Sequence, residues 1–414
     1  MEEVIVGLDI GTSKTCCVIA LIGETGQLRV VGMGLCSSEG VRGGVIMSMK
    51  AATKAVQVAV EKAEIDSKGY EVRGVLVSIT GGSVKGINSR GVVGVAHPNE
   101  ITQGDVDRVI DSAKALAISL DREFLHVIPQ EYVVDDVPKI KNPLEMMGIR
   151  LEANVHLILG SVSATRGLVS CVNSAGFLVT EVVLESLASS ASVLSEEERE
   201  VGVLLIDFGG GTTDAVLYID GAPHHTQVIP IGSDRVTKDL AQVLQIPDED
   251  AEQIKVIQGA CWEPILSDPE EEVIIRSVGS RPAHTIARRE VCHIIQARVD
   301  EILNLVYKEV HQAGYLTRLG GGIVLTGGGA NLAGITDLVR EIFGKDVRVG
   351  FPQQMEGLNV NHYQPEYTAA LGLVKLGGDK IKSQITYQPN RQKGSAKKEG
   401  IWSRFQNWFK KNWI

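Results

Sequence analysis

The sequence lacks the features that mark exported and membrane-spanning proteins. Its six cysteines form no C-x-x-C pair and no ligand cluster, so we expect free thiols in a reducing, cytosolic setting. No window of 18 apolar residues occurs, which argues against a transmembrane helix. The N-terminus has acidic residues, Glu2 and Glu3, before a short apolar stretch, which is unlike a signal peptide.

Two common nucleotide-binding motifs are also missing. There is no G-x-x-x-x-G-K-[ST] run, hence no P-loop, and no G-x-G-x-x-G after a first strand, which disfavours a dinucleotide-binding fold. The net charge of −10 argues against a general nucleic-acid binder, because such proteins are basic. What remains is a globular composition over 414 residues, enough for two or three domains at roughly 150 residues each.

The charge is unevenly distributed along the chain. Residues 381–414 contain eight basic residues and one acid, a charge of +7, whereas the rest of the chain carries −17. Residues 382–399 are polar and poor in apolar side chains, which predicts a flexible linker. A basic end on an acidic body suggests that the end has its own partner.

The last fifteen residues, GIWSRFQNWFKKNWI, predict an amphipathic helix. On a helical wheel their aromatic side chains fall within an arc of about 140°, with basic and polar residues opposite, although Asn412 and Ile414 break the pattern. Such a helix can lie in a bilayer surface, with Trp at the headgroup boundary and basic residues near anionic lipid. The alternative is a helix that docks on the body or on a protein partner. The predicted membrane residues are Trp402, Phe405, Trp408, Phe409, Lys410, Lys411 and Trp413.

Two Gly-rich hairpins repeat one another. LDIGTSKT at 8–15 and IDFGGGTTD at 206–214 each follow an apolar strand, place an aspartate at its end and continue into a second strand. The two aspartates, Asp9 and Asp207, lie 198 positions apart. One such turn is commonly only a turn, but the matched pair indicates an internal duplication.

The residue types of these hairpins suit a polyphosphate. Glycines let backbone N–H groups approach phosphate oxygens, hydroxyl groups add donors, and Lys14 adds a point charge for the β- and γ-phosphates. Asp9 and Asp207 would repel a polyphosphate unless a hydrated Mg²⁺ lay between them. The predicted phosphate loops are Gly11, Thr12, Ser13 and Lys14, and Gly209, Gly210, Gly211, Thr212 and Thr213.

A third glycine run follows an apolar stretch at 323–326. Gly327, Gly328 and Gly329 would let a flat adenine or ribose lie against backbone. Taken alone, the run is equally consistent with a helix start capped by Asn331.

The motifs LDIGTSKT, LESLASS, LIDFGGGTTD, LTGGGANLAGI and YTAALGL together resemble the actin, hexokinase and heat-shock chaperone ATPase superfamily. Within it, VIPQEYVVDD, NPLEMMGIRLEANVH and HTQVIPIGSDRVTKDLA resemble the FtsA family of bacterial cell-division proteins, almost continuously over residues 4–377. The resemblance implies an actin-like, two-lobed, duplicated α/β fold that binds ATP and Mg²⁺, has weak ATPase activity at most and is not a metabolic enzyme.

The resemblance also implies roles for single residues. Asp9 and Asp207 organise Mg²⁺ through water, Glu252 and Lys255 flank the nucleoside, and Gly327–Gly329 bracket the adenine. Glu185 and Asp207 are the candidate catalytic residues, with Glu185 orienting water. The sequence departs from the family pattern in two places: Ser186 replaces the proline after Glu185, and Glu145 replaces a glycine in the loop 142–148.

Domains and partners follow from the same resemblance. We expect a first lobe at 1–83 with 161–193 and 355–380, an FtsA-type insertion at 84–160, a second lobe at 194–354 with an outer subdomain at about 236–314, a linker at 381–399 and the C-terminal helix at 400–414. The outer subdomain would bind the acidic C-terminal peptide of the tubulin-like FtsZ through Arg281 and Arg298, unless these are only solvated surface charges. The insertion would contact neighbouring subunits and other division proteins.

The predicted function is an ATP-binding, self-associating protein that anchors the FtsZ ring to the cytoplasmic face of the membrane at the division septum. The alternatives within the superfamily are a small-molecule kinase, a chaperone-type ATPase and a pilus-assembly scaffold. A kinase has no reason for the aromatic, basic C-terminal segment, and a chaperone would need a β-rich peptide-binding domain after residue 380, which the sequence does not show. The FtsA-like subdomain and the C-terminal segment argue against the pilus-assembly scaffold.

Overall fold

The computed structural model describes residues 2–116, 118–275 and 283–386 of the chain. The first of its two large sheets has the strand order β11-β6-β1-β2-β3. β1 is antiparallel to β2 and parallel to β6. These strands are β1 (Glu3–Ile10), β2 (Lys14–Ile22), β3 (Leu28–Ser37), β6 (Gly74–Ile79) and β11 (Leu178–Leu184).

The second sheet repeats this plan with the order β14-β13-β12-β17-β18. β12 is antiparallel to β13 and parallel to β17, as β1 is to β2 and β6. The repeat confirms the duplication predicted from the two hairpins. Its strands are β12 (Val203–Phe208), β13 (Thr213–Ile219), β14 (Ala222–Ile229), β17 (Ile323–Thr326) and β18 (Val347–Val349).

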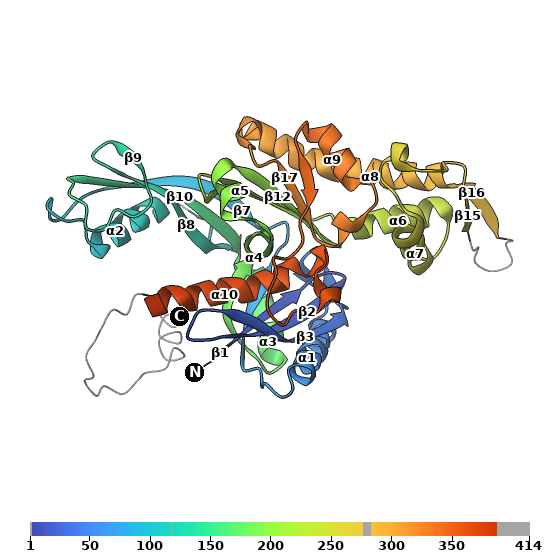
Figure 1. Ribbon diagram of the computed structural model, residues 1–414, viewed down its shortest axis with the longest axis horizontal. Helices are drawn as coiled ribbons and strands as arrows, with labels where there is room; N and C mark the ends of the chain where they lie inside the picture. The colour runs from blue at the N-terminus through green and yellow to red at the C-terminus, as the bar shows by residue number, and fades with distance from the viewer. Residues whose placement is uncertain (1, 117, 276–282, 387–414) are drawn as a thin grey trace.

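Two helices pack in the space between the sheets, α4 (Glu185–Val193) and α10 (Thr368–Thr386) (Figure 1). α4 contacts β6 and β11 of the first sheet and β12 and β13 of the second. Gly372 of α10 lies so close to the backbone of Ala188 that a Cβ there would overlap the Ala188 carbonyl oxygen. The two helices therefore meet backbone against backbone.

Further helices cover the outer faces. α1 (Met49–Asp66) buries an alanine and valine stripe against β2 and β3, as its apolar periodicity predicts. α3 (Val162–Ser174) packs beside α1. A short hairpin of β4 (Val41–Arg42) and β5 (Val45–Ile46) precedes α1.

A separate subdomain is inserted between β6 and α3, at the left of Figure 1. We call it the inserted subdomain. Its four-stranded sheet has the order β7-β10-β8-β9 and carries one helix on a face. Its elements are β7 (Lys85–Gly94), α2 (Gln103–Lys114), β8 (Arg122–Val134), β9 (Val137–Ile140) and β10 (Arg150–Ser161).

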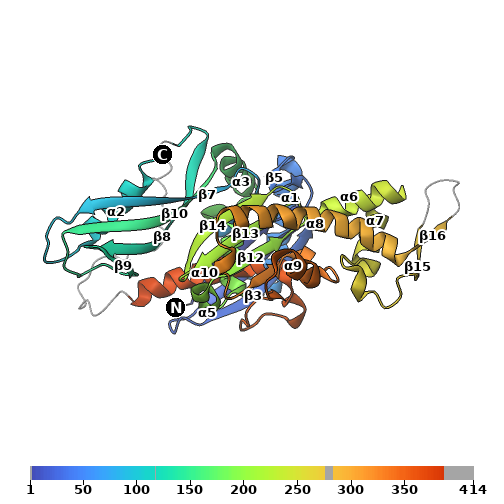
Figure 2. The same cartoon turned by 90° about the horizontal axis from the view of Figure 1, so that it is seen from above.

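The opposite end of the molecule is formed by helices next to the second sheet (Figure 2). α8 is 25 residues long and runs from that sheet out to the β15–β16 hairpin. These elements are α6 (Ser233–Leu244), α7 (Asp248–Gln258), β15 (Glu272–Ile275), β16 (His284–Ala287) and α8 (Arg288–Gln312), with α5 (Glu196–Val201) and α9 (Ile335–Phe343) nearer the centre.

Local details correct or explain three expectations. The polar run GAPHHTQ at 221–227 suggests an exposed turn, but the pair His224-His225 lies half-buried in β14, because the turn falls at Asp220–Gly221. Asn331 caps no α-helix, since α9 begins at Ile335. Glu145 has a φ of 65°, the left-handed region that favours glycine, so the loop 142–148 keeps a backbone conformation that suits the family's glycine.

Candidate functional site

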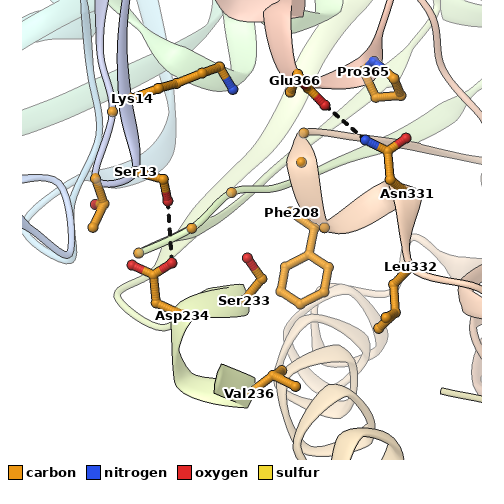
Figure 3. Close-up of a pocket in the computed structure, with 18 of the residues that line it drawn as sticks. Ser13, Lys14, Phe208, Ser233, Asp234, Val236, Asn331, Leu332, Pro365 and Glu366 are labelled. Carbon is orange, nitrogen blue, oxygen red and sulfur yellow. Dashed lines mark hydrogen bonds between the residues drawn. The ribbon is translucent and has the colours of Figure 1, made fainter. Parts of the chain in front are cut away.

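A cleft of about 380 Å³ lies between the two sheets, α6 and α7 (Figure 3). It is lined by the turns after β1 and β12, the start of α4 and the loop after β17. Thr213 is the exception among the predicted residues, because it is buried behind the turn and its hydroxyl donates to the Ile231 carbonyl at 2.8 Å. The predicted residues that line the cleft are Asp9, Gly11, Thr12, Ser13, Lys14, Glu185, Asp207, Gly209, Gly210, Gly211, Thr212, Glu252, Lys255, Gly327, Gly328 and Gly329.

The two hairpin turns have the same internal hydrogen bond and touch each other. The Gly11 N–H donates to the Lys14 carbonyl at 3.0 Å, and the Gly209 N–H donates to the Thr212 carbonyl at 3.0 Å. A Cβ at Gly211 would overlap the Thr12 hydroxyl, so only glycine allows this approach. The glycine run of the second turn thus serves contact with the first turn as well as access for a ligand.

Each strand-end aspartate is held by a serine. The Ser78 hydroxyl donates to Asp9 Oδ1 at 2.6 Å, and the Ser189 hydroxyl of α4 donates to Asp207 Oδ2. Burial raises the pKa of Asp9, and it raises the pKa of Asp207 to about 6. A cation bound in the cleft would therefore stabilise the ionised form of both aspartates.

Lys14 is the cation of the first turn. Its Nζ lies 5.2 Å from the centroid of the Tyr367 ring, a cation–π distance. Its charge lowers the pKa values of Asp9 and Asp207, although burial outweighs it. A single lysine does not neutralise the acids around it.

Two further acids complete this cluster. Glu185 is the first residue of α4, and its pKa is raised well above the usual value by burial and by Asp9, Asp214 and Asp207. Burial, reinforced by Asp207, raises the pKa of Asp214 to about 8, while the Thr80 hydroxyl donates to both Asp214 oxygens at 2.6 and 2.7 Å. Sequence reasoning missed Asp214, although the hairpin register places it directly opposite Asp207.

The residues predicted to flank a nucleoside lie at the other end of the cleft. Glu252 and Lys255 of α7 form an ion pair at 2.7 Å, and both bond to the Thr237 hydroxyl. Across the cleft, the loop after β17 presents Gly327–Gly329, and Asn331 Nδ2 donates to Glu366 at 2.9 Å (Figure 3). A slot therefore lies between the charged side chains of α7 and the glycine backbone of the loop after β17.

One further contact joins the walls near the hairpin tips. The Ser13 hydroxyl donates to Asp234 Oδ1 at 3.3 Å, linking the first turn to α6 (Figure 3). Asp234 and Glu366 were not predicted as site residues, because each is brought to the cleft by contacts distant in the chain.

Asp9 and Asp207 fit a hydrated Mg²⁺. Their carboxylate oxygens are the hard donors that this ion prefers, and burial with too little cationic charge is what raises their pKa values. Within the described ranges, no group of three or more His, Cys, Asp or Glu side chains is placed to hold a metal. A cation here would therefore keep several water ligands.

Of the predicted partner and membrane residues, the structure describes only Arg298. Arg281 and the membrane residues Trp402, Phe405, Trp408, Phe409, Lys410, Lys411 and Trp413 lie outside the described residues. Arg298 of α8 forms ion pairs with Asp239 and Glu301, and only 20% of its side chain is exposed. Among the residues that the structure covers, no helix has the length and apolar character needed to cross a membrane.

Solved structures with a similar fold define the class. The chain is similar to a chain of a PilM–PilN type IV pilus biogenesis complex, with a TM-score of 0.63 and 15% identity over 90% of this chain and 98% of the other. It is also similar to MreB5 of Spiroplasma citri bound to ADP, with a TM-score of 0.56 and 14% identity over 93% and 99% of the two chains. The duplicated sheets and the cleft between them are thus an actin-like fold.

The sequence comparisons give the family. Residues 204–372 match the family described as Cell division protein FtsA, and residues 81–159 match the SHS2 domain inserted in FTSA. The chain is 47% identical to the cell division protein FtsA of Borreliella burgdorferi, over 100% of both chains. It is 35% identical to that of Escherichia coli strain K12, over 99% of this chain and 98% of the relative. The chain belongs to the FtsA family of cell-division proteins.

Proposed function

We propose that this cell-division protein binds ATP with Mg²⁺ in the cleft and that nucleotide-dependent closure of the two lobes controls its self-association into filaments. The observation that carries the proposal is the pair of touching turns, each with a buried aspartate at its strand end, on duplicated sheets. Gly11–Lys14 and Gly209–Thr212 hold the phosphates, and the loop Gly327–Gly329 holds the adenine against Glu252 and Lys255.

This chain's residues fix what the bound ion and nucleotide can do. Mg²⁺ would supply the positive charge that the acid cluster lacks. Asp9 and Asp207 would hold the ion through its water ligands, while the Ser78 and Ser189 hydroxyls each donate to one oxygen of these carboxylates. Glu185, whose pKa is raised by burial and by the neighbouring acids, positions water near the terminal phosphate and supports weak hydrolysis at most.

Calorimetric titration of the purified chain with Mg-ATP tests this assignment. We expect saturable binding that needs the metal and that weakens strongly in D207N and K14A. Binding that persists unchanged in both variants would refute the site.

The C-terminal segment is the proposed membrane anchor of the protein. The C-terminal segment 400–414 would lie in the cytoplasmic membrane surface at the division septum and so anchor the FtsZ ring, as its aromatic and basic pattern suggests. Co-sedimentation with anionic vesicles should pellet the full chain but not a chain ending at Glu399, with and without ATP. Equal pelleting would show that the segment is not the anchor.

The acidic FtsZ peptide is proposed to bind near Arg298 and Arg281. Because Arg298 already pairs with Asp239 and Glu301, the peptide carboxylates would have to share or displace these partners. Fluorescence anisotropy with an FtsZ C-terminal peptide should show weaker binding for R298A and R281A than for R340A, whose arginine lies on α9. The same affinity for all three variants would exclude this arginine pair.

A further inference from the structure

We propose that His126 of the inserted subdomain is a positioning residue through which that subdomain sets the placement of Glu185 in the cleft. Its Nε2 accepts a hydrogen bond from the Leu184 backbone N–H at 2.9 Å. Leu184 directly precedes Glu185 and is fully buried. The inference rests on the proposed nucleotide site, because Glu185 acts there.

The Leu184 N–H lies at the junction between β11 and α4. Leu184 is the last residue of β11 and directly precedes the first turn of α4. No side chain caps that helix. The backbone turns from strand to helix at this residue, so the strand ladder ends here. Leu184 is the last partner in the ladder between β11 and β6, opposite Ile79, and β11 is the edge strand of its sheet. The imidazole of His126 therefore supplies the acceptor for the Leu184 N–H from outside the sheet.

The acceptor comes from a different unit of the molecule. His126 lies in β8, where it pairs with Ile158 of β10, and both strands also contact β14 of the second sheet. A shift of the inserted subdomain relative to the first sheet must therefore either break this hydrogen bond or move the start of α4.

The same helix also reaches the other acids of the cleft. Ser189, one turn after Glu185, donates to Asp207, and Ser192 donates to the Thr368 carbonyl at the start of α10. The far end of α10 returns to this junction, because Lys380 forms an ion pair with Glu181 of β11. α4 is thus held at both ends, and the His126 hydrogen bond adds a polar link to the apolar contacts between this junction and the inserted subdomain.

The test compares H126L, which removes the acceptor at similar volume, with H126Q, which keeps an amide oxygen as acceptor. H97L is the matched control, because His97 is an exposed histidine of the same subdomain. Affinity is measured for Mg-ADP alone and for Mg-ADP with aluminium fluoride, a mimic of the transferring phosphate. Hydrogen exchange of the segment 184–193 is measured on the ligand-free proteins.

We expect H126L to leave Mg-ADP affinity within about twofold and to weaken binding of the aluminium fluoride complex about tenfold, since only that complex needs Glu185 in place. H126Q and H97L should resemble the wild type. H126L should add little to E185Q, because both remove the same interaction. Equal losses for both ligands, or additive losses with E185Q, would overturn the proposal.

Hydrogen exchange separates this inference from the proposed function. If the wild type binds no nucleotide, the proposed function fails, yet faster exchange of 184–193 in H126L alone would still support the His126 link. If H126L does not fold, the wild-type protein decides: slow exchange of the Leu184 amide supports the bond, and exchange as fast as in exposed loops overturns it.

Discussion

The two hairpins of the cleft have the same backbone geometry but differ in the charges that they carry. Both turns close through the same hydrogen bond and end their first strand with a buried aspartate. The residue opposite Asp9 in the ladder is Cys16, whereas the residue opposite Asp207 is Asp214. The first turn carries Lys14 at the position where the second carries Thr212.

This difference shows how a duplicated unit can become asymmetric without losing its geometry. The first hairpin keeps an uncharged thiol behind its aspartate and adds a cation in front, while the second adds an acid and no cation. Burial raises the pKa of Cys16 well above the usual value, so it stays neutral. The cation and the extra acid therefore approach the cleft from opposite walls.

The largest effect is expected when the first hairpin is given the acid of the second. C16D adds a further buried acid beside Asp9. We expect the free energy of unfolding to fall by about 3 kcal/mol, measured by denaturant titration with circular dichroism. C36D, a half-exposed cysteine of the same sheet, is the control and should cost far less; equal losses would contradict the comparison.

Removal of the cation should come next. K14A removes the charge-assisted contacts to phosphate, so we expect Mg-ATP affinity to fall by about 2 kcal/mol, roughly 30-fold. T212A, at the matching position of the second turn, should lose much less. K50A, an exposed lysine at the start of α1, controls for net charge. Calorimetric titration measures all three, and a loss in T212A as large as in K14A would show that the turns are equivalent.

The contact between the turns can be broken by one methyl group. In G211A the new Cβ collides with Thr12, and the second turn must move away from the first. We expect a loss of about 2 kcal/mol in stability, together with weaker nucleotide binding. G94A, where a Cβ meets no atom within 4 Å, is the control in thermal melts. Unchanged stability of G211A would show that the turns need not touch.

The smallest effect is expected for the partly exposed hydrogen bond between the first turn and α6. S13A removes the 3.3 Å hydrogen bond to Asp234, and we expect less than about 1 kcal/mol in stability. Differential scanning calorimetry without nucleotide isolates this term from any phosphate contact by Ser13. A loss as large as that of G211A would mean that the hydroxyl, and not close backbone packing, holds the turns together.

Much of the site could be predicted because its signals are local. The turn residues Gly11–Lys14 and Gly209–Thr212 are contiguous, and the apolar strands around them fix which residue ends each strand. The helix over residues 49–66 and the strand Gly74–Ile79 follow from periodicity for the same reason.

The partners of the acids could not be predicted, because they come from distant segments. Ser78 reaches Asp9 from 69 positions away, and Thr80 reaches Asp214 from 134 positions away. Hydroxyl residues are common, and only the packing of the sheets determines which ones meet a carboxylate. Asp214 itself was within reach, since a tight hairpin pairs it with Asp207. The polar run at 221–227 likewise hides a strand, because the turn at Asp220–Gly221 falls earlier than that run suggests.

The backbone contact between Gly372 and Ala188 has a mechanical consequence. α10 has 19 residues, a length of about 28 Å at 1.5 Å per residue, and its first residues lie in the floor of the cleft. At this crossing the backbones are in direct contact, so we expect a displacement of one helix to displace the other. A displacement at the outer end of α10 should therefore be felt at Glu185 and Ser189 of α4, and a change in the width of the cleft should in turn displace α10.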